Sequence, residues 1–351
     1  MNSRTTHGPA GVGVRLAVVG PSTLKGKELT EILPESTMAA AEVRLLDDED
    51  TLGQLEAVGE EVTFVQAVAV DNFNDADVVF FTSDPSFTRQ TFPLALRAGS
   101  AVVDLSYGLE DEKSASVRAP WLDRELAEGM PMDLQPGPVI VAHPASIVLG
   151  LLLLRLSKVV KARTTAVTVF EPASERGKKG LDELHQQTVN LLSFQSLPKD
   201  VYDAQVAFNL LSRFGAAAAS SLESTEKKIA EHLRRIVRGR VPVPSLMLVQ
   251  AAIFHGHAFS LYLELEKPAS MGDLAQALAG EHVEIVRGEE ESPSNVGAAG
   301  QESIMVTLRA DAQNANGIWI WAAADNLRVT ALNAIGCAEQ LVASRPRGQV
   351  Q

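Results

Sequence analysis

The chain has 351 residues, of which 46% are hydrophobic and 21% charged, a globular composition long enough for two domains. Its formal net charge of -13 argues against binding to nucleic-acid phosphates or to anionic membrane surfaces. A single cysteine, Cys337, excludes an intrachain disulfide and fits a reducing cytoplasm, and no Cys/His cluster has zinc-ligand spacing. The strongly apolar run 147–154 is much shorter than the ~20 residues of a membrane span. We therefore expect a cytoplasmic protein whose partners are neither nucleic acids nor membranes.

The first part of the chain alternates strand-like and helix-like segments. Residues 1–13 are polar, and we expect a disordered leader there. The β-prone run 14–19 ends in Gly20 and is followed by a helical pattern, as in a buried parallel strand that leads into a helix. The alternation predicts a parallel sheet covered on both faces. The expected strands are 14–19, 42–46, 77–82, 101–105 and 139–142, and the expected helices are 25–33 and 86–98.

The pattern changes near residue 145, where longer helices and half-buried strands begin. The acidic segment 281–300, rich in Gly, Ser and Pro, predicts a surface loop. Expected helices cover 147–160, 177–192, 222–237 and 328–342, and expected strands cover 166–170, 258–266, 304–309 and 318–323. We therefore expect one domain from 14–145 with 325–343, a second α+β domain at 146–324 with a mixed or antiparallel sheet, and a disordered tail at 344–351.

Eight segments of the chain, in order, resemble the aspartate-semialdehyde dehydrogenase family. They are 18–26 (VVGPSTLKG), 102–106 (VVDLS), 141–146 (VAHPAS), 170–177 (FEPASERG), 207–209 (AFN), 255–257 (HGH), 325–327 (DNL) and 331–334 (ALNA). The resemblance spans about residues 14–342. It implies a Rossmann-like NAD(P)-binding domain joined to an α+β dimerisation domain, and therefore a homodimer. Within the family, the pattern is most similar to the non-catalytic Usg-like paralogues.

The resemblance weakens at the reacting positions. Enzymes of this family attack an aldehyde with a cysteine thiolate, pass hydride to the nicotinamide and release the acyl group to phosphate. Here the cysteine position holds Ser146, whose hydroxyl is scarcely ionised at neutral pH. The family glutamine falls on Glu171, the phosphate-binding arginine on Glu110 and the carboxylate-binding arginine on Gln250. Only the general-base histidine is kept, as His257, while His143 and Ala145 replace two asparagines.

Three hypotheses about function follow from these substitutions. The first is a family member that lacks the family's reaction and acts by binding a small molecule or by assembly. The second is a genuine NAD(P)-dependent semialdehyde dehydrogenase with another nucleophile or substrate. The third is a hydrolase in which His257 activates Ser146. Structural roles compete with these: Ser146 as a core or helix-cap serine, His257 as an inherited polar residue, and Cys337 as a packed thiol.

The expected nucleotide site combines a glycine turn with an acidic strand end. Thr23 replaces the middle glycine of the family's turn, where its Cβ would crowd a pyrophosphate. The acidic run 47–50 favours NAD over NADP because it would repel a 2′-phosphate, although a solvated acidic turn explains it too. The segment beginning at Asp325 lacks the family's Lys-Gly pair, which makes binding of either cofactor doubtful. The candidate cofactor residues are Gly20, Ser22, Thr23, Gly26, Asp47 and Asn326.

Overall fold

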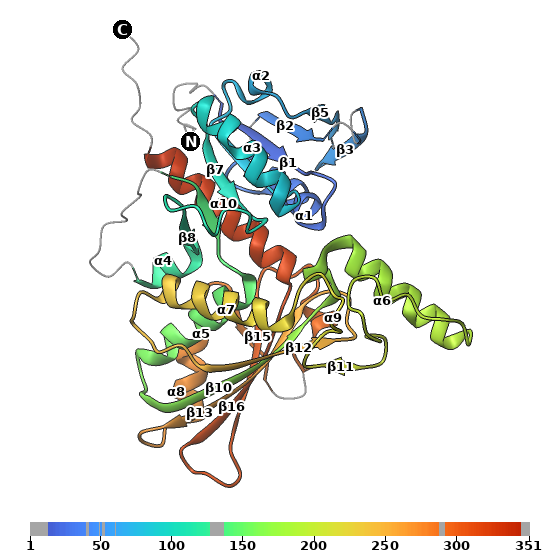
Figure 1. Ribbon diagram of the computed structural model, residues 1–351. Coiled ribbons are helices and arrows are strands. Elements are labelled where there is room, and N and C mark those ends of the chain that lie inside the picture. The colour runs from blue at the N-terminus through green and yellow to red at the C-terminus, as the bar shows by residue number, and fades with distance from the viewer. Residues whose placement is uncertain are drawn as a thin grey trace, which may run out of the picture.

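The computed structural model describes residues 13–39, 42–48, 50, 53–59, 61–126, 137–287 and 292–344. Figure 1 shows two domains, with the long helix α10 (Asn326–Ser344) running along their junction. Residues 1–12 of the expected leader and 345–351 of the expected tail lie outside the described residues. Ser344, the first residue of the expected tail, is the last residue of α10.

The first domain is built on a seven-stranded sheet in which all neighbours are parallel. The strand order is β5-β2-β1-β6-β7-β9-β8. Successive strands are added on one side of β1 up to β5 and on its other side from β6 onward, so the order of strands reverses between β1 and β6. The central strands are continuous apolar runs because helices cover both faces. The strands are β1 (Arg15–Val19), β2 (Glu42–Asp47), β5 (Gln66–Ala67), β6 (Val78–Phe81), β7 (Ala101–Asp104), β8 (Ser116–Arg118) and β9 (Val139–Val141).

Short helices and one hairpin complete this domain. Helix α1 (Leu24–Ile32) packs on α10, whereas α2 (Val70–Phe73) and α3 (Pro85–Arg97) pack together. The antiparallel hairpin β3 (Leu55–Val58) and β4 (Glu61–Phe64) packs against α1. A 3-10 turn, η1 (Leu33–Glu35), extends α1, and α4 (Pro120–Leu126) leads toward the second domain.

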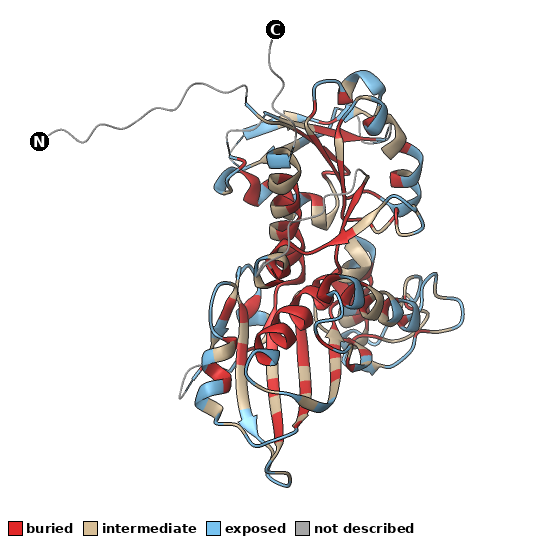
Figure 2. Cartoon of the chain, turned by 90° about the vertical axis from the view of Figure 1, so that its left-hand side faces the viewer, coloured by how far each residue is buried: buried red, intermediate tan, exposed pale blue. Residues whose placement is uncertain are grey.

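The second domain contains a mixed seven-stranded sheet in the order β11-β12-β10-β13-β16-β15-β14. The pairs β10–β12 and β14–β15 are parallel, and the remaining pairs are antiparallel. Buried and partly exposed residues alternate along the central strands, as Figure 2 shows. The strands are β10 (Ala162–Glu171), β11 (Leu210–Leu211), β12 (Ser245–Ala251), β13 (His257–Leu265), β14 (Val283–Ile285), β15 (Ile304–Ala310) and β16 (Gly317–Ala324).

Helices cover one face of this mixed sheet. The helix α5 (Pro144–Ser157) is almost entirely buried and contacts both α7 (Leu222–Val237) and α8 (Met271–Leu278). The helix α6 (Gly177–Leu192) follows the 3-10 turn η3 (Ala173–Arg176) and projects from the body of the domain (Figure 1). A short helix, α9 (Asn295–Ala298), packs against β16.

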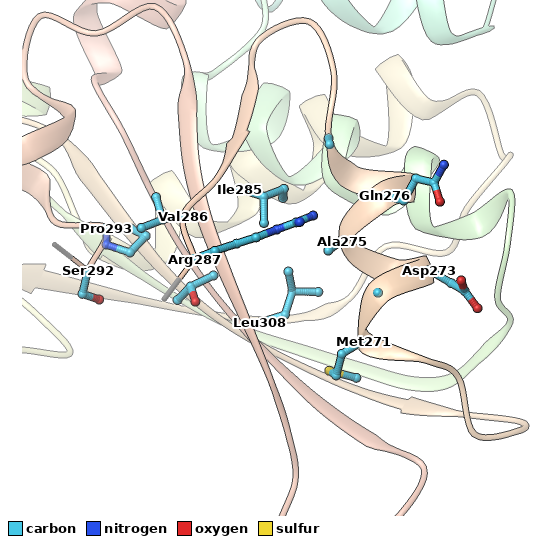
Figure 3. Close-up of a pocket in the computed structure, with 13 residues that line it drawn as sticks. Met271, Asp273, Ala275, Gln276, Ile285, Val286, Arg287, Ser292, Pro293 and Leu308 are labelled. Carbon is cyan, nitrogen blue, oxygen red and sulfur yellow. The ribbon is translucent and has the colours of Figure 1, made fainter. Parts of the chain in front are cut away.

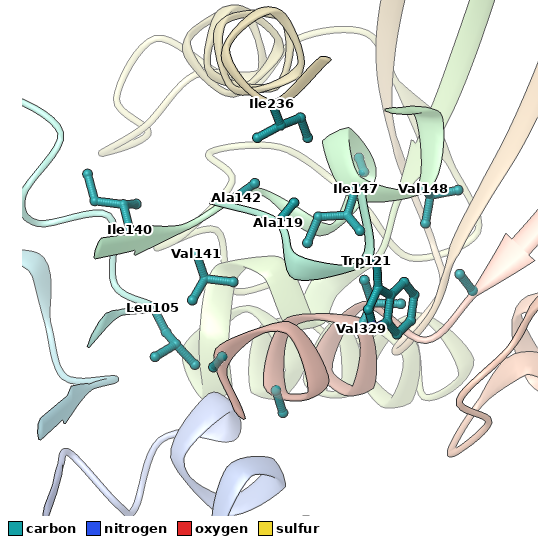
Figure 4. Close-up of a cluster of buried hydrophobic side chains, with 14 of the residues drawn as sticks. Leu105, Ala119, Trp121, Ile140, Val141, Ala142, Ile147, Val148, Ile236 and Val329 are labelled. Carbon is teal, nitrogen blue, oxygen red and sulfur yellow. The ribbon is translucent and has the colours of Figure 1, made fainter. Parts of the chain in front are cut away.

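Apolar side chains from both domains meet in one core. Figure 4 shows Trp121 of α4, Ile147 of α5, Ile236 of α7 and Val329 of α10 around the end of β9. All four side chains are at least nine-tenths buried. Burial of this kind contributes about 25 cal/mol per Å² of apolar surface, so the junction holds the two domains together.

The predicted fold class, a parallel Rossmann-like domain followed by a mixed-sheet domain, is confirmed. The predicted bounds of α6 and α7 agree with the structure. The prediction that 281–300 is only a loop is wrong, because β14 pairs with β15 and α9 forms there. The helix expected at 147–160 begins three residues earlier, since His143 caps it by accepting a hydrogen bond from the amide of Ala145.

Candidate active site and nucleotide cleft

The serine at the nucleophile position is committed to an internal hydrogen bond. Ser146 lies in the first turn of α5 and is fully buried. Its hydroxyl donates to the carbonyl oxygen of Ile229 on α7 at 2.8 Å. The bond ties α5 to α7, which is the role of a core serine. No base accepts this proton, so the hydroxyl is not activated as a nucleophile.

Three predicted site residues come together at the ends of three neighbouring strands. Glu171 of β10 and Gln250 of β12 are partners in parallel register, and His257 begins β13 on the other side of β10. All three side chains are buried. The side-chain amide nitrogen of Gln250, Nε2, donates to the backbone carbonyl oxygens of Glu171 at 2.9 Å and Ala251 at 3.1 Å. Its donors are therefore used by the backbone rather than offered to a ligand.

The carboxylate of Glu171 is paired with a cation that the sequence reasoning missed. Arg176 Nη2 lies 2.5 Å from Glu171 Oε1 and also donates to Thr225 Oγ1 at 3.1 Å. Burial raises the pKa of Glu171 to about 7, and Arg176 opposes that rise. Glu171 Oε2 and Arg176 Nε lack hydrogen-bond partners within the described part of the chain. The motif FEPASERG carried the signal, since it places the arginine five residues after the glutamate.

His257 is buried without a polar contact. Neither ring nitrogen has a hydrogen-bond partner among the described residues, and its ring centroid lies 5.7 Å from that of His143. Burial lowers the pKa of His257, which favours the neutral imidazole. The hydrogen bond that would join a nucleophilic Ser146 to this base is absent, because Ser146 donates to Ile229 instead.

Glu110, the acidic residue at the phosphate position, is paired with basic side chains of the same chain. Glu110 lies 3.0 Å from the Nε2 of His232 and 3.3 Å from the ammonium of Lys228, both on α7. These partners hold the pKa of Glu110 below its usual value despite burial. A pocket of about 550 Å³ opens beside them and is also lined by Arg176 and Thr225. It therefore lies next to the Glu171–Arg176 pair.

Asn326 and Cys337 both lie in α10, at the junction between the domains. Asn326 donates to Glu175 Oε1 at 2.7 Å and accepts from Ser174 Oγ at 3.1 Å and the amide of Gly256 at 3.0 Å. Cys337 is buried in α10, and burial raises the pKa of its thiol. A thiol of this kind is protonated and inert, as expected for a packed cysteine.

The glycine turn after β1 keeps the two glycines that its geometry requires. Gly20 has φ +84°, and a Cβ there would lie 2.6 Å from the amide nitrogen of Ser83. A Cβ on Gly26 would lie 2.4 Å from the carbonyl oxygen of Gly20. Thr23 caps α1: its hydroxyl accepts from the Gly26 amide at 3.0 Å and donates to Gly20 O at 2.9 Å. The threonine therefore supports the turn.

Asp47 is the acidic residue that we expect at a ribose position. Asp47 ends β2, next to β1, and is 8% exposed. Burial raises the pKa of its carboxyl group, and the hydroxyl of Ser22 lies 3.5 Å away. A carboxylate at this strand end suits the two hydroxyls of a ribose.

A larger pocket, of about 1030 Å³, lies in the second domain between α8 and the strands β14 and β15. Figure 3 shows α8, with Met271, Asp273 and Gln276, on one side and Ile285 and Leu308 on the other. None of the predicted site residues lines this pocket. In the ranges that the structure describes, no group of three or more acidic, His or Cys side chains could hold a metal ion. No helix of those ranges is long and apolar enough to cross a bilayer.

Comparison with known families identifies both domains. The model for the semialdehyde dehydrogenase NAD binding domain matches residues 15–129, and that for the semialdehyde dehydrogenase dimerisation domain matches residues 153–329. The chain belongs to the semialdehyde dehydrogenase family. The resemblance drawn from the eight sequence segments is thereby confirmed.

Relatives named aspartate-semialdehyde dehydrogenase and relatives named USG-1 protein homolog are both similar to this chain. An aspartate-semialdehyde dehydrogenase of Rickettsia bellii is 24% identical over 335 residues, covering 93% of this chain and 97% of the relative. A USG-1 protein homolog of Pseudomonas aeruginosa is 29% identical over 335 residues, covering 94% and 98%. Overall sequence similarity therefore does not decide between these two groups of relatives.

Solved structures of the semialdehyde dehydrogenase family share the fold. A probable aspartate-semialdehyde dehydrogenase from Pseudomonas aeruginosa superposes with a TM-score of 0.83 at 27% identity, covering 95% of this chain and 99% of that chain. Aspartate semialdehyde dehydrogenase II from Vibrio cholerae, complexed with ASA, gives a TM-score of 0.81 at 22% identity, covering 96% and 100%. The second likeness concerns the fold alone.

Proposed function

We propose that this chain is a binding or assembly member of the semialdehyde dehydrogenase family that does not carry out phosphate-dependent oxidation of an aldehyde. The observation that supports this most directly is the hydrogen bond from Ser146 to Ile229 O at 2.8 Å. A hydroxyl buried in this way, with no base as its acceptor, does not attack a carbonyl at a useful rate.

Three further contacts support the same proposal. Where the resemblance expects a free arginine for the substrate carboxylate, the amide of Gln250 is bonded to backbone carbonyls. Where it expects an arginine for phosphate, the chain has Glu110, whose carboxylate is paired with Lys228. The one added cation, Arg176, is paired with Glu171. An anionic substrate therefore lacks the bidentate partner that an unpaired arginine provides.

The test is an assay of the purified protein at high concentration with aspartate semialdehyde, phosphate and either NAD or NADP, following the absorbance of reduced cofactor. An aspartate-semialdehyde dehydrogenase from another source is the positive control. We expect no turnover above the uncatalysed rate. Turnover in the usual range of ~1–1000 per second would reject the proposal and favour a divergent dehydrogenase.

The two alternative functions make different demands on the site. A divergent dehydrogenase needs another nucleophile, and the buried thiol of Cys337 does not supply it. A hydrolase needs Ser146 hydrogen-bonded to His257, whereas the serine donates to Ile229 O. A chromogenic ester such as p-nitrophenyl acetate tests the hydrolase directly, and His257→Ala with unchanged hydrolysis would assign any background to other groups.

We further infer a homodimer formed through the second domain, a cytoplasmic protein, and a preference for NAD over NADP. The dimerisation-domain match at 153–329 supports the first inference. The single cysteine is consistent with the second. Asp47 at the end of β2 supports the third, since its carboxylate suits a ribose diol and repels a 2′-phosphate.

A further inference from the structure

A lysine of α1 reaches across the carboxyl ends of the central strands of the first domain. Lys25 lies in the first turn of α1, directly after β1, and its ammonium donates to the carbonyl oxygen of Leu105 at 2.8 Å. Leu105 follows β7, which is separated from β1 by β6. The lysine side chain therefore covers the ends of β6 and β7.

A tyrosine fixes the lysine in this position. The ammonium of Lys25 lies 4.1 Å from the ring centroid of Tyr107, and Lys228 of α7 lies 4.4 Å from the same centroid. The ring of Tyr107 stacks on that of His143, with centroids 5.9 Å apart. Each ammonium also has an oxygen partner, Leu105 O for Lys25 and Glu110 for Lys228. These contacts combine hydrogen bonds with cation–π attraction, so the arrangement is held from several sides.

The backbone of Tyr107 has an unusual conformation, which sets the position of its ring. Its φ of +64° lies in the left-handed region that non-glycine residues rarely adopt. Its hydroxyl is buried without a hydrogen-bond partner among the described residues. A strained backbone and an unpaired hydroxyl both cost stability, and such costs gather at functional sites. The ring position is therefore kept at the expense of stability.

This arrangement covers one half of the region in which the fold would place a dinucleotide. In a doubly wound sheet, a dinucleotide lies across the strand ends where the strand order reverses, here between β1 and β6. The half that holds adenosine lies toward β2, where Asp47 ends the strand. The half that holds nicotinamide lies toward β6 and β7, which Lys25 and Tyr107 cover. Lys25 and Tyr107 therefore occupy the nicotinamide half and leave the strand end beside Asp47 uncovered by these two side chains.

We propose that the cleft of the first domain recognises the adenosine diphosphate part of a nucleotide, with Lys25 and Tyr107 excluding the nicotinamide ring. This proposal rests on the inferred nucleotide binding and on the proposed absence of dehydrogenase activity, since hydride transfer needs a seated nicotinamide ring. The ligand class is an adenosine diphosphate compound such as ADP or ADP-ribose. It explains how a nucleotide fold persists in a chain without a hydride-transfer site, because ligand binding no longer needs the reacting ring.

The test compares NAD with ADP-ribose by isothermal titration calorimetry on the full chain. Both probes carry the adenosine diphosphate and the second ribose, and only NAD carries the nicotinamide. We expect the two dissociation constants to agree within about threefold. In Lys25→Ala the nicotinamide end opens, and NAD should tighten about tenfold relative to ADP-ribose, since a ring of this size gains contact area. Lys27→Ala, on the exposed side of the same helix, should leave the ratio unchanged.

Each result of this experiment decides something. If wild type binds NAD more than about threefold tighter than ADP-ribose, the proposal is overturned, as it is by an unchanged ratio in Lys25→Ala. If neither probe binds, nucleotide recognition itself is wrong. The wild-type comparison decides the question without the variant, should Lys25→Ala fail to fold. Aldehyde oxidation in the separate activity assay would reject both proposals, because hydride transfer needs a seated nicotinamide ring. A failed binding ratio without such oxidation would reject the nucleotide proposal alone.

Discussion

Glu171 and Gln250 are register partners on the parallel strands β10 and β12, and the side-chain amide of Gln250 donates to the backbone carbonyl of Glu171 at 2.9 Å. The side chain of one residue thus closes the strand end of the other. One carboxylate oxygen of Glu171 lacks a partner among the described residues, while the other pairs with Arg176. The Gln250 bond joins the carboxyl ends of the two strands without presenting a charged fork to a substrate.

Glu171 should make the stability of the protein depend on pH near neutrality. Burial raises its pKa from the usual 4.5 to about 7 in the folded chain, so the folded state binds the proton more tightly than the unfolded state. The stabilisation is complete at acidic pH and is lost as the pH rises toward and through 7. Glu171→Gln removes this loss. We expect the free energy of unfolding of the variant, relative to wild type, to rise by about 2–3 kcal/mol between pH 5 and pH 8.

Urea unfolding at the two pH values measures this difference. Glu223→Gln is the matched control, because Glu223 is exposed on α7 and pairs with Lys227, which lowers its pKa out of this range. The control should show the same pH dependence as wild type. A Glu171→Gln curve parallel to wild type would show that the carboxyl group titrates normally.

Ser146→Cys should restore neither the thiolate nor the reaction. The new sulfur would occupy a fully buried position facing Ile229 O, and burial raises the pKa of a thiol. We expect no aldehyde oxidation and alkylation by iodoacetamide at least about tenfold slower than that of an exposed cysteine. Mass spectrometry follows the alkylation, with Ser220→Cys as the exposed comparison and Cys337 replaced by Ala in both. Rapid alkylation together with turnover would show that a single substitution had silenced this site.

More of the fold than of the candidate site could be predicted from the sequence. The helix bounds at Gly177 and Val237 were predicted because amphipathic periodicity and helix signals are local. The strand β14 was missed because it has only three residues and depends on pairing with β15. The strand β12, which follows a proline-containing segment, and the eight-residue helix α8 were also missed.

The contacts of the site lie beyond local pattern. Lys25 reaches Leu105 across 80 positions, and Ser146 reaches Ile229 across 83. The sequence indicated which residues replace the family's reacting groups, but not the hydrogen bonds and ion pairs that these replacements make. The pairing of Glu171 with Arg176 was within reach, since the two are five residues apart on adjoining elements.

Asp47 should set the preference between the two nicotinamide cofactors. Its carboxylate, at the end of β2, is placed to repel a 2′-phosphate. Asp47→Asn removes one negative charge, and we expect NADP binding to tighten about tenfold relative to NAD. Calorimetric titration measures both dissociation constants. Asp50→Asn, at an exposed position of the same turn, should change the ratio by less than about threefold. Tighter binding of NADP than NAD by wild type would remove Asp47 from this role.

The second domain should associate through the arm formed by α6 and the segment that follows it. Figure 1 shows α6 projecting away from the rest of the chain. Its end carries Leu192 and Phe194, which are 70% and 98% exposed, and Phe208 is 69% exposed. Large apolar side chains presented so openly mark an interaction surface. A twofold copy would bury the arm of each chain against the other, which makes an isologous interface.

Light scattering at micromolar concentration should therefore give about twice the 37.5 kDa chain mass. Leu192→Asp with Phe194→Asp places two charges on the arm, and desolvating them in the interface should shift the protein toward the monomer by at least about tenfold in dissociation constant. Leu96→Asp, also at an exposed apolar position but on α3 of the first domain, is the control and should stay dimeric. A wild-type monomer that remains soluble would reject the dimer. A dimer unaffected by the double substitution would place the interface elsewhere, most directly on the uncovered face of the mixed sheet around Trp319 and Trp321.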